Sequence, residues 1–388
     1  MSGAALEPFR YEAPAEALDD LRSRLAATRW PDPETVADWS QGVPLRYLRE
    51  LCEHWRLEHD WRRAERRLAG LPQFRTEIDG TAIHFLHLPS PHEGALPLLL
   101  THGWPSSVLE FLEVVEPLAD PVRDGGAAAD AFHVVCPSLP GFGFSAAPRR
   151  TGWGPAGIAA AWAELMSRLG YERFAAHGGD WGAAVTRSLA HVAPERLVGI
   201  HLDGDHVPRA TVERLGAETE YERRALARRN EFGKRGTGYS RLQATRPQTL
   251  GAALADSPAG QCAWIVEKFA AWSDGGAEDP AGLFGPQVLL DTVTLYWLTQ
   301  TAASAARIYW EAAREPTAGP AGNGVPTAVS VYPADINLAS ERWIAAGDPD
   351  LIRYRALERG GHFAALEVPD LFVAELRAAF AAIRERGR

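Results

Sequence analysis

Apolar residues near the start of the chain recur every three or four positions, which is the spacing of one helix face. The two groups with this spacing are Leu18, Leu21 and Leu25, then Leu45, Leu48 and Trp55. The sequence Trp30-Pro31-Asp32-Pro33 separates them, because proline interrupts helical backbone. We therefore expect residues 1–77 to form a helical segment that wraps around a core and does not fold alone.

From about residue 80 the pattern changes to short apolar runs that alternate with helical ones. The candidate strands are Leu98–Thr101, Phe132–Cys136, Phe174–His177, Leu197–Leu202, Thr327–Tyr332 and Ile352–Leu357. A helical pattern at 155–169 ends at Gly170, and another occupies 369–384. This alternation predicts an α/β fold, with a mostly parallel sheet and helices on both of its faces.

The alternation stops between about residues 205 and 320, where the chain is helical and rich in aromatic residues. These aromatic residues include Trp264, Trp272, Tyr296, Trp297, Tyr309 and Trp310. The stretch ends in a linker rich in glycine and proline, Glu315–Pro326. We expect a helical cap at 205–320, inserted between a first core part at 78–204 and a second at 321–388.

Composition narrows the class of protein. The net charge of −10 argues against a nucleic-acid partner, because binding phosphates requires a basic surface. Cys52, Cys136 and Cys262 are too few and too scattered for a disulfide framework or a metal cluster. No stretch reaches the roughly 18 apolar residues of a membrane span, and no signal pattern opens the chain. We therefore expect a cytoplasmic protein with no membrane attachment.

The strongest local motif is His177-Gly178-Gly179-Asp180-Trp181-Gly182, which follows an apolar strand and precedes a helix of small residues. A glycine-x-nucleophile-x-glycine turn in this context is typical of the nucleophile elbow of the α/β-hydrolase fold. Glycines allow the backbones to approach closely and leave the central side chain exposed. That side chain is the carboxylate of Asp180, and no Gly-x-Ser-x-Gly occurs in the chain, which disfavours a serine esterase. The simpler alternative is an aspartate that only caps the next helix.

Two further residues complete a catalytic order of nucleophile, acid and histidine. His362, in Arg359-Gly360-Gly361-His362-Phe363, lies between a candidate strand and the last helix. This is where the α/β-hydrolase fold has its catalytic histidine. Asp335 follows the preceding strand in Tyr332-Pro333-Ala334-Asp335. Taken alone, His362 could be structural and Asp335 a turn residue. Together with Asp180 they predict a triad.

The sequence Thr101-His102-Gly103-Trp104-Pro105 follows another strand and predicts an oxyanion hole. The backbone N–H of Trp104 would act with that of Trp181 on a developing negative charge. The Trp-Pro bond is a candidate for the cis form, which is essentially restricted to proline. We assign His102 a structural role in orienting this loop. Pro140-Gly141-Phe142-Gly143 lacks the third glycine and acidic partner of a nucleotide loop, so we predict a turn there.

These motifs together resemble the microsomal-type epoxide hydrolases, and the resemblance covers nearly the whole chain. The motifs that carry it are H-G-W-P at 102–105, P-G-F-G-x-S at 140–145, G-G-D-W-G at 178–182, R-G-G-H-F-A-A-L-E-x-P at 359–369 and L-x-x-L-R-x-R-L-x-x-T-R-W-P at 18–31. The family has an α/β-hydrolase core with an inserted cap. Its members convert epoxides to vicinal diols with no metal and no cofactor.

The resemblance also implies site residues. In the family two cap tyrosines hold the epoxide oxygen, and the matching positions are Tyr239 and Tyr309. The family's acid matches Asp335, although vertebrate members have a glutamate there. Those members also have an N-terminal membrane anchor, which we do not expect here because the chain begins directly with the wrapping segment.

The function that follows is hydrolysis of an epoxide through an ester of Asp180, which water activated by His362 then cleaves. Trp104, Pro105, Trp181 and the aromatic cap predict a roomy apolar pocket for a bulky or aryl epoxide. A haloalkane dehalogenase uses the same aspartate elbow. However, this chain has Trp104 where a dehalogenase has its halide-binding asparagine, and it has cap tyrosines, which a dehalogenase lacks. A binding protein that has lost catalysis is the other alternative, although every catalytic position is filled.

Lysine is rare, with only Lys234 and Lys268, whereas arginine and alanine abound, which suggests a GC-rich bacterial genome. Together with the family likeness, this resembles the epoxide hydrolases of actinobacterial natural-product pathways, including enediyne antibiotic biosynthesis. The sequence leaves open the physiological substrate, the carbon attacked, the enantiopreference and a homodimeric state.

Overall fold

A nine-stranded sheet forms the centre of the computed structural model, which describes residues 5–204, 207–315 and 322–386. The strands lie in the order β1-β2-β3-β5-β4-β6-β7-β8-β9. Their bounds are β1 Glu7–Pro8, β2 Gln73–Ile78, β3 Thr81–Leu88, β4 Leu96–Thr101, β5 Phe132–Pro137, β6 Phe174–Gly179, β7 Leu197–Asp203, β8 Thr327–Val331 and β9 Leu351–Ala356. Pairs among β1, β2, β3 and β5 are antiparallel, whereas all pairs from β5 through β4 to β9 are parallel. The predicted mostly parallel sheet and its six strands are confirmed.

The antiparallel edge corrects one sequence-based expectation. Residues 73–77 were expected to be helical, but they belong to β2, which pairs with β3 in a hairpin. Asp79 and Gly80 form its tight turn, both with positive φ (52° and 74°). A two-residue Asp-Gly turn of this type matches the twist of the strands on either side. This dipeptide was the signal that could have revealed the hairpin.

Helices cover both faces of the sheet. On one face α5 (Pro155–Arg168) and α6 (Trp181–Val192) pack together, and on the other lie α4 (Val115–Ala119) and α17 (Pro369–Arg386). Successive residues of β4 show the two faces, because Leu99 belongs to one apolar cluster and Leu100 to the other. Side chains of a strand alternate between its faces in this way. Two short helices, α15 (Glu341–Ala345) and α16 (Ala364–Glu367), flank β9 in the chain.

The connection from β7 to β8 contains a series of helices, as predicted for the cap. They are α7 Arg209–Leu215, α8 Glu220–Glu231, α9 Gly238–Thr245, α10 Pro247–Asp256, α11 Pro258–Trp272, α12 Pro280–Phe284, α13 Pro286–Thr299 and α14 Ala302–Ala312. The predicted linker Glu315–Pro326 falls largely outside the described residues, which omit 316–321. The four-part division of the chain stays a prediction.

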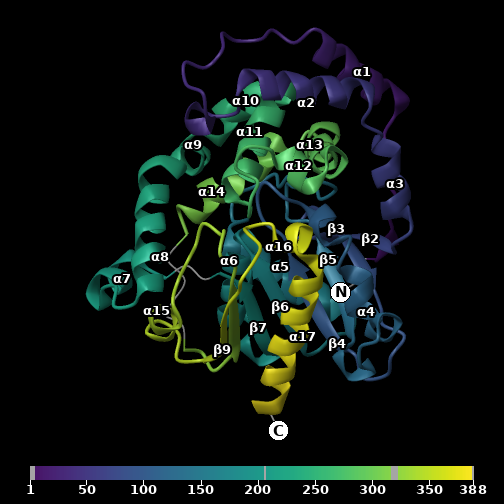
Figure 1. Ribbon diagram of the computed structural model, residues 1–388. Helices are drawn as coiled ribbons and strands as arrows, with labels where there is room; N and C mark the ends of the chain where they lie inside the picture. The colour runs from purple at the N-terminus through teal and green to yellow at the C-terminus, as the bar shows by residue number, and fades with distance from the viewer. Residues whose placement is uncertain (1–4, 205–206, 316–321, 387–388) are drawn as a thin grey trace.

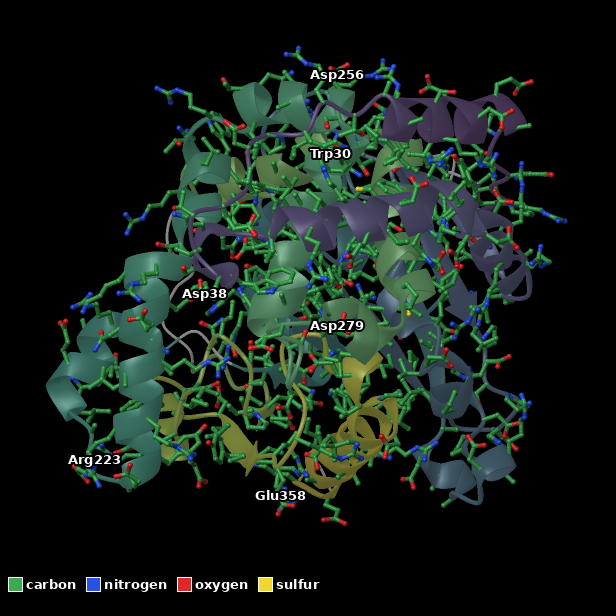
Figure 2. All side chains as sticks on the ribbon, turned by 45° about the horizontal axis from the view of Figure 1, so that its top comes forward. Trp30, Asp38, Arg223, Asp256, Asp279 and Glu358 are labelled. Carbon is green, nitrogen blue, oxygen red and sulfur yellow. The ribbon has the colours of Figure 1, made fainter. Side chains whose placement is uncertain are left out.

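The N-terminal helices α1 (Ala15–Ala26), α2 (Leu45–Leu57) and α3 (Trp61–Ala69) lie against the cap. Figure 1 shows α1 and α2 across the top of the molecule, over α10, α11 and α13, and α3 descending towards the sheet edge. The buried Trp55 indole donates to Thr294 Oγ1 at 2.8 Å, which ties α2 to α13. Two further contacts involve cap residues labelled in Figure 2: Arg24 with Asp256, and Tyr47 with Asp279. This segment therefore fixes the cap from outside. In the described part of the chain, every helix is too short or too polar to span a bilayer.

Candidate active site

Asp180 sits at the sharp turn between β6 and α6, with φ 50° and ψ −123°. An L residue rarely adopts a positive φ, so the turn is strained and needs support from its neighbours. Glycine is required on both sides of Asp180. A Cβ on Gly178 would lie 2.1 Å from the backbone of Gly182, and a Cβ on Gly182 would lie 1.9 Å from the carbonyl oxygen of Thr101. The two glycines thus allow the strand and helix to approach and leave the Asp180 side chain exposed to the site.

The loop after β4 faces this carboxylate. The backbone N–H of Trp104 donates to Asp180 Oδ1 at 2.8 Å. Gly103 lies so close that an added Cβ would be 2.4 Å from Asp180. The Trp104–Pro105 bond is cis, as expected, and Pro105 is buried. The described residues contain no hydrogen bond from the Trp181 amide to Asp180, so the second donor of the oxyanion hole stays a prediction.

His102 anchors this loop instead of facing the carboxylate. Its Nε2 accepts the backbone N–H of Leu139 at 3.1 Å, and its Nδ1 lies 3.0 Å from the carbonyl oxygen of Gly103. Burial lowers its pKa to about 4, so the ring is neutral at neutral pH. These contacts fit the structural role expected for His102.

The fold brings His362 and Asp335 to Asp180 from distant parts of the chain. His362 Nδ1 lies 2.8 Å from Asp335 Oδ1, and its Nε2 lies 3.5 Å from Asp180 Oδ2. Asp335 is buried in the turn after β8, and His362 precedes α16. Burial alone would lower the pKa of His362, but the Asp335 and Asp180 carboxylates outweigh it and raise the pKa well above its usual value. The imidazole therefore lies between two carboxylates, as the predicted triad requires.

The cap supplies aromatic side chains opposite Asp180. Tyr239 from α9 stacks on Trp104 with ring centres 5.1 Å apart, and Tyr309 from α14 meets Trp181 edge-on at 4.6 Å. The two tyrosine rings are 5.9 Å apart. Burial, reinforced by Asp180, raises the pKa of Tyr239 well above its usual value. Burial likewise raises the pKa of Tyr309, so both phenols stay protonated at neutral pH and remain hydrogen-bond donors.

Two buried hydrogen-bond donors in this aromatic layer lack a well-aligned acceptor. Among the described residues, the Tyr309 hydroxyl and the Trp181 Nε1–H have no partner within full hydrogen-bond geometry, although the Tyr309 hydroxyl lies close to the Trp181 and Tyr239 side chains. An unpaired buried donor costs roughly 1–3 kcal/mol, so such groups call for an explanation. A ligand oxygen bound between the cap and Asp180 would supply the partner.

A small cavity next to Asp180 reveals two carboxyl groups that the sequence analysis did not single out. Its volume is about 20 Å³, and Glu110 and Asp203 line it together with Asp180 and His362. Asp203 ends β7, so its place at the carboxyl edge of the sheet was a usable signal. Glu110 lies in the short 3₁₀ helix η2 (Val108–Phe111), where a charged residue among apolar neighbours was the available signal.

Behind Asp203 lies a buried group with possible metal ligands. His177, His201 and Asp203 place ligand atoms within 4.8 Å of one another. The histidines already bind each other through their Nδ1 atoms at 2.9 Å, and His201 Nε2 lies 3.0 Å from Ser330 Oγ. Burial lowers the pKa of His177 to about 3, so its ring is neutral. We interpret the group as a buried hydrogen-bond network.

Comparisons with known proteins place this geometry in a family. Residues 97–302 match the family model of the alpha/beta hydrolase fold, and residues 6–111 match that of the epoxide hydrolase N terminus. A Stigmatella aurantiaca protein that is named as an epoxide hydrolase is 53% identical to this chain, over 98% of this chain and 86% of its own length. Epoxide hydrolase 1 of Sus scrofa is 34% identical over 96% of this chain and 88% of its own length.

Solved structures agree with these matches. The crystal structure of juvenile hormone epoxide hydrolase from the silkworm Bombyx mori has a TM-score of 0.89 at 28% identity, and the match covers 99% of this chain and 96% of that one. The fold and the elbow define an α/β hydrolase with a helical cap. Within that class the chain belongs to the epoxide hydrolases. The resemblance deduced from the motifs is confirmed, and the dehalogenase alternative loses its support.

Proposed function

We propose that this epoxide hydrolase opens its substrate by attack of Asp180 Oδ2 on an epoxide carbon. A carboxylate is ionised at neutral pH and needs no base to activate it. Oδ1 already accepts the Trp104 N–H, which leaves Oδ2 as the free oxygen on the side of His362. The product of this step is an ester of Asp180 with the opened substrate.

The departing epoxide oxygen needs a proton or a strong hydrogen bond. Tyr239 and Tyr309 supply donors from the cap, and the Tyr309 hydroxyl, which has no well-aligned acceptor among the described residues, is available for this role. Their ring contacts with Trp104 and Trp181 hold them above the carboxylate. In this proposal the cap stabilises the alkoxide while the core supplies the nucleophile.

In the second step His362 Nε2 takes a proton from water, and the water oxygen attacks the ester carbonyl of Asp180. Asp335 orients the imidazole and stabilises its charged form through the 2.8 Å contact. The developing oxyanion lies on the oxygen that Trp104 holds, with the Trp181 amide as the expected second donor. The single observation that carries this scheme is the placement of Trp104 and His362 on different oxygens of one carboxylate.

A single turnover in water labelled with heavy oxygen tests the scheme. Attack on the ester carbonyl puts solvent oxygen into the Asp180 carboxylate and leaves the first diol unlabelled. Mass spectrometry of the diol and of the peptide containing Asp180 distinguishes the two positions. Heavy oxygen in the first diol, with an unlabelled peptide, would mean that water attacks a substrate carbon and not the ester carbonyl, and would refute the scheme.

The substrate we propose is a bulky or aryl epoxide. Trp104 stacks on Tyr239 and Trp272 packs against it at a tilt, so the wall opposite Asp180 is aromatic and suits a flat apolar group. Pro105, buried beside Trp104, is expected to complete this wall. A panel of chiral epoxides tests this proposal through kcat/KM. A preference for small aliphatic epoxides over styrene-oxide-like ones would contradict it.

We further propose a cytoplasmic location and a role on a natural-product intermediate. All three cysteines are free and buried, which fits a reducing compartment. Cell fractionation tests the location, and metabolite profiling after gene deletion tests the role. Sedimentation velocity would decide between a monomer and the homodimer left open by the sequence.

A further inference from the structure

The cavity beside the catalytic dyad has the size of a water site. Its volume of about 20 Å³ suits one water molecule or at most two, since each needs roughly 10–15 Å³ of such space. Both groups that the second step requires, Asp180 and His362, contribute to its wall. Water in this cavity would therefore lie next to the ester carbonyl and next to the base.

Glu110 is the residue on this wall with an uncommitted carboxyl group. It lies among the buried residues Val108, Leu109 and Phe111 of η2 and has no ion pair with a cation among the described residues. The Ser106 hydroxyl is beside it and favours its charged form, without reaching full hydrogen-bond geometry. The helix thus presents a lone carboxyl to the cavity.

Asp203, the other additional carboxyl, is oriented differently. Its Oδ2 is 3.6 Å from His177 Nε2, and its enclosed Oδ1 has no hydrogen-bond partner among the described residues but lies 3.9 Å from His201 Nδ1. Asp203 therefore faces the buried histidine pair, whereas the carboxyl oxygens of Glu110 are not enclosed in this way. Of the two, Glu110 is the better placed to bind a molecule in the cavity.

The surroundings also determine what kind of hydrogen bond Glu110 can make. Burial, reinforced by Asp180 and opposed by the Ser106 hydroxyl and His362, raises the pKa of Glu110 to about 8. At neutral pH the group is largely protonated, so it can donate one hydrogen bond and accept another. A water molecule needs two to four such partners to be held in a buried site.

We infer that Glu110 is a positioning residue that holds the hydrolytic water in this cavity, between the Asp180 ester and His362. This inference rests on the proposed function. The water gives one proton to His362 Nε2 while its oxygen bonds to Cγ of Asp180, and the negative charge forms on Oδ1. The charge on Oδ1 then reforms the carbonyl, the bond from Cγ to the substrate-bearing Oδ2 breaks, and the leaving alkoxide takes the proton from His362. Asp180 is left as a carboxylic acid and loses the second proton of the water to solvent. Glu110 neither gains nor loses a proton in this sequence.

The test compares Glu110→Leu with Glu110→Gln in single-turnover experiments that resolve ester formation from ester hydrolysis. Leucine fills a similar volume without hydrogen bonds and admits no additional water, whereas glutamine keeps a donor and an acceptor. We expect Glu110→Leu to form the ester at a near wild-type rate and to hydrolyse it about 10- to 100-fold more slowly. Glu110→Gln should recover most of the hydrolysis rate. Glu113→Ala, an exposed neighbour, is the matched control.

A purely structural role for Glu110 would slow both steps together, which is why the ratio of the two rates is the deciding readout. Equal slowing of both steps, unchanged hydrolysis in Glu110→Leu, or Glu110→Gln as slow as Glu110→Leu would each overturn the inference. If Glu110→Leu does not fold, Glu110→Met gives the same comparison with a more adaptable side chain. Failure of the proposed function looks different, because the wild-type protein itself would then form no ester.

Discussion

Trp104 and His362 approach the two oxygens of Asp180 from different sides. The Trp104 N–H donates to Oδ1 at 2.8 Å, while His362 Nε2 lies 3.5 Å from Oδ2. The carboxylate is therefore asymmetric before any substrate binds. One oxygen is held by a backbone donor, and the other faces the histidine.

Replacing the proposed nucleophile should stop the reaction at its first step. Asp180→Asn keeps the shape of the side chain but removes its charge, so no ester should form and turnover should fall by about 10⁴-fold or more. Intact-mass measurement after mixing with excess epoxide checks for the adduct. An Asp180→Asn protein that still carries substrate mass on the Asp180 peptide would contradict the assignment.

His362→Gln should block the second step, hydrolysis of the ester, and leave ester formation intact. Ester formation needs no base, so the adduct should form, and it should then persist because no group activates water. Mass spectrometry of the peptide containing Asp180 should show nearly complete modification within the first turnover. Absence of a trapped adduct with a good substrate would mean that His362 has another role.

The cap tyrosines should affect ester formation more than ester hydrolysis. Tyr239→Phe and Tyr309→Phe each remove one donor to the departing oxygen, and each should slow alkylation by about 10- to 100-fold. Stopped-flow measurement of the first step checks this. Tyr171→Phe, whose hydroxyl binds His87, is the control. An unchanged alkylation rate in both cap variants would remove the tyrosines from the mechanism.

The pH dependence of ester hydrolysis should report His362. Its pKa is raised by Asp335 and Asp180, and only the neutral ring can accept a proton, so hydrolysis should slow as pH falls through that pKa. In the ester Asp180 has lost its charge, which leaves Asp335 as the main cause of the raised pKa. Asp335→Asn should therefore move the acid limb of the single-turnover profile to lower pH. A limb that stays in place would show that another group titrates.

The elbow itself should tolerate no side chain at its second glycine. Gly182→Ala would place a Cβ 1.9 Å from the Thr101 carbonyl oxygen, so the strand and helix would have to separate. We expect a loss of about 3 kcal/mol or more in the free energy of unfolding, measured by urea denaturation. Gly233→Ala, where nothing lies within 4 Å of the added Cβ, should be nearly neutral. Equal stabilities of the two variants would contradict this account.

Local patterns in the sequence were sufficient for most of the sheet and for the elbow. The strands β4 to β9 lie in apolar runs flanked by turn residues, and these signals do not depend on distant contacts. The glycines around Asp180 are likewise a local signal, because the tight turn from β6 to α6 leaves no room for a Cβ on either side of the aspartate. The exception is β2, where residues near the Asp79-Gly80 turn were assigned to the helical segment.

Only the tertiary structure decided which side chains share the site with Asp180. The sequence signals for Glu110 and Asp203, an acidic residue among apolar neighbours and one at a strand end, are weak because such placements are common. Their raised pKa values come from burial and from charges on other elements, including Asp180 beside Glu110 and Asp335 beside Asp203. Burial and proximity of this kind arise from packing between residues far apart in the chain, and no local pattern encodes them.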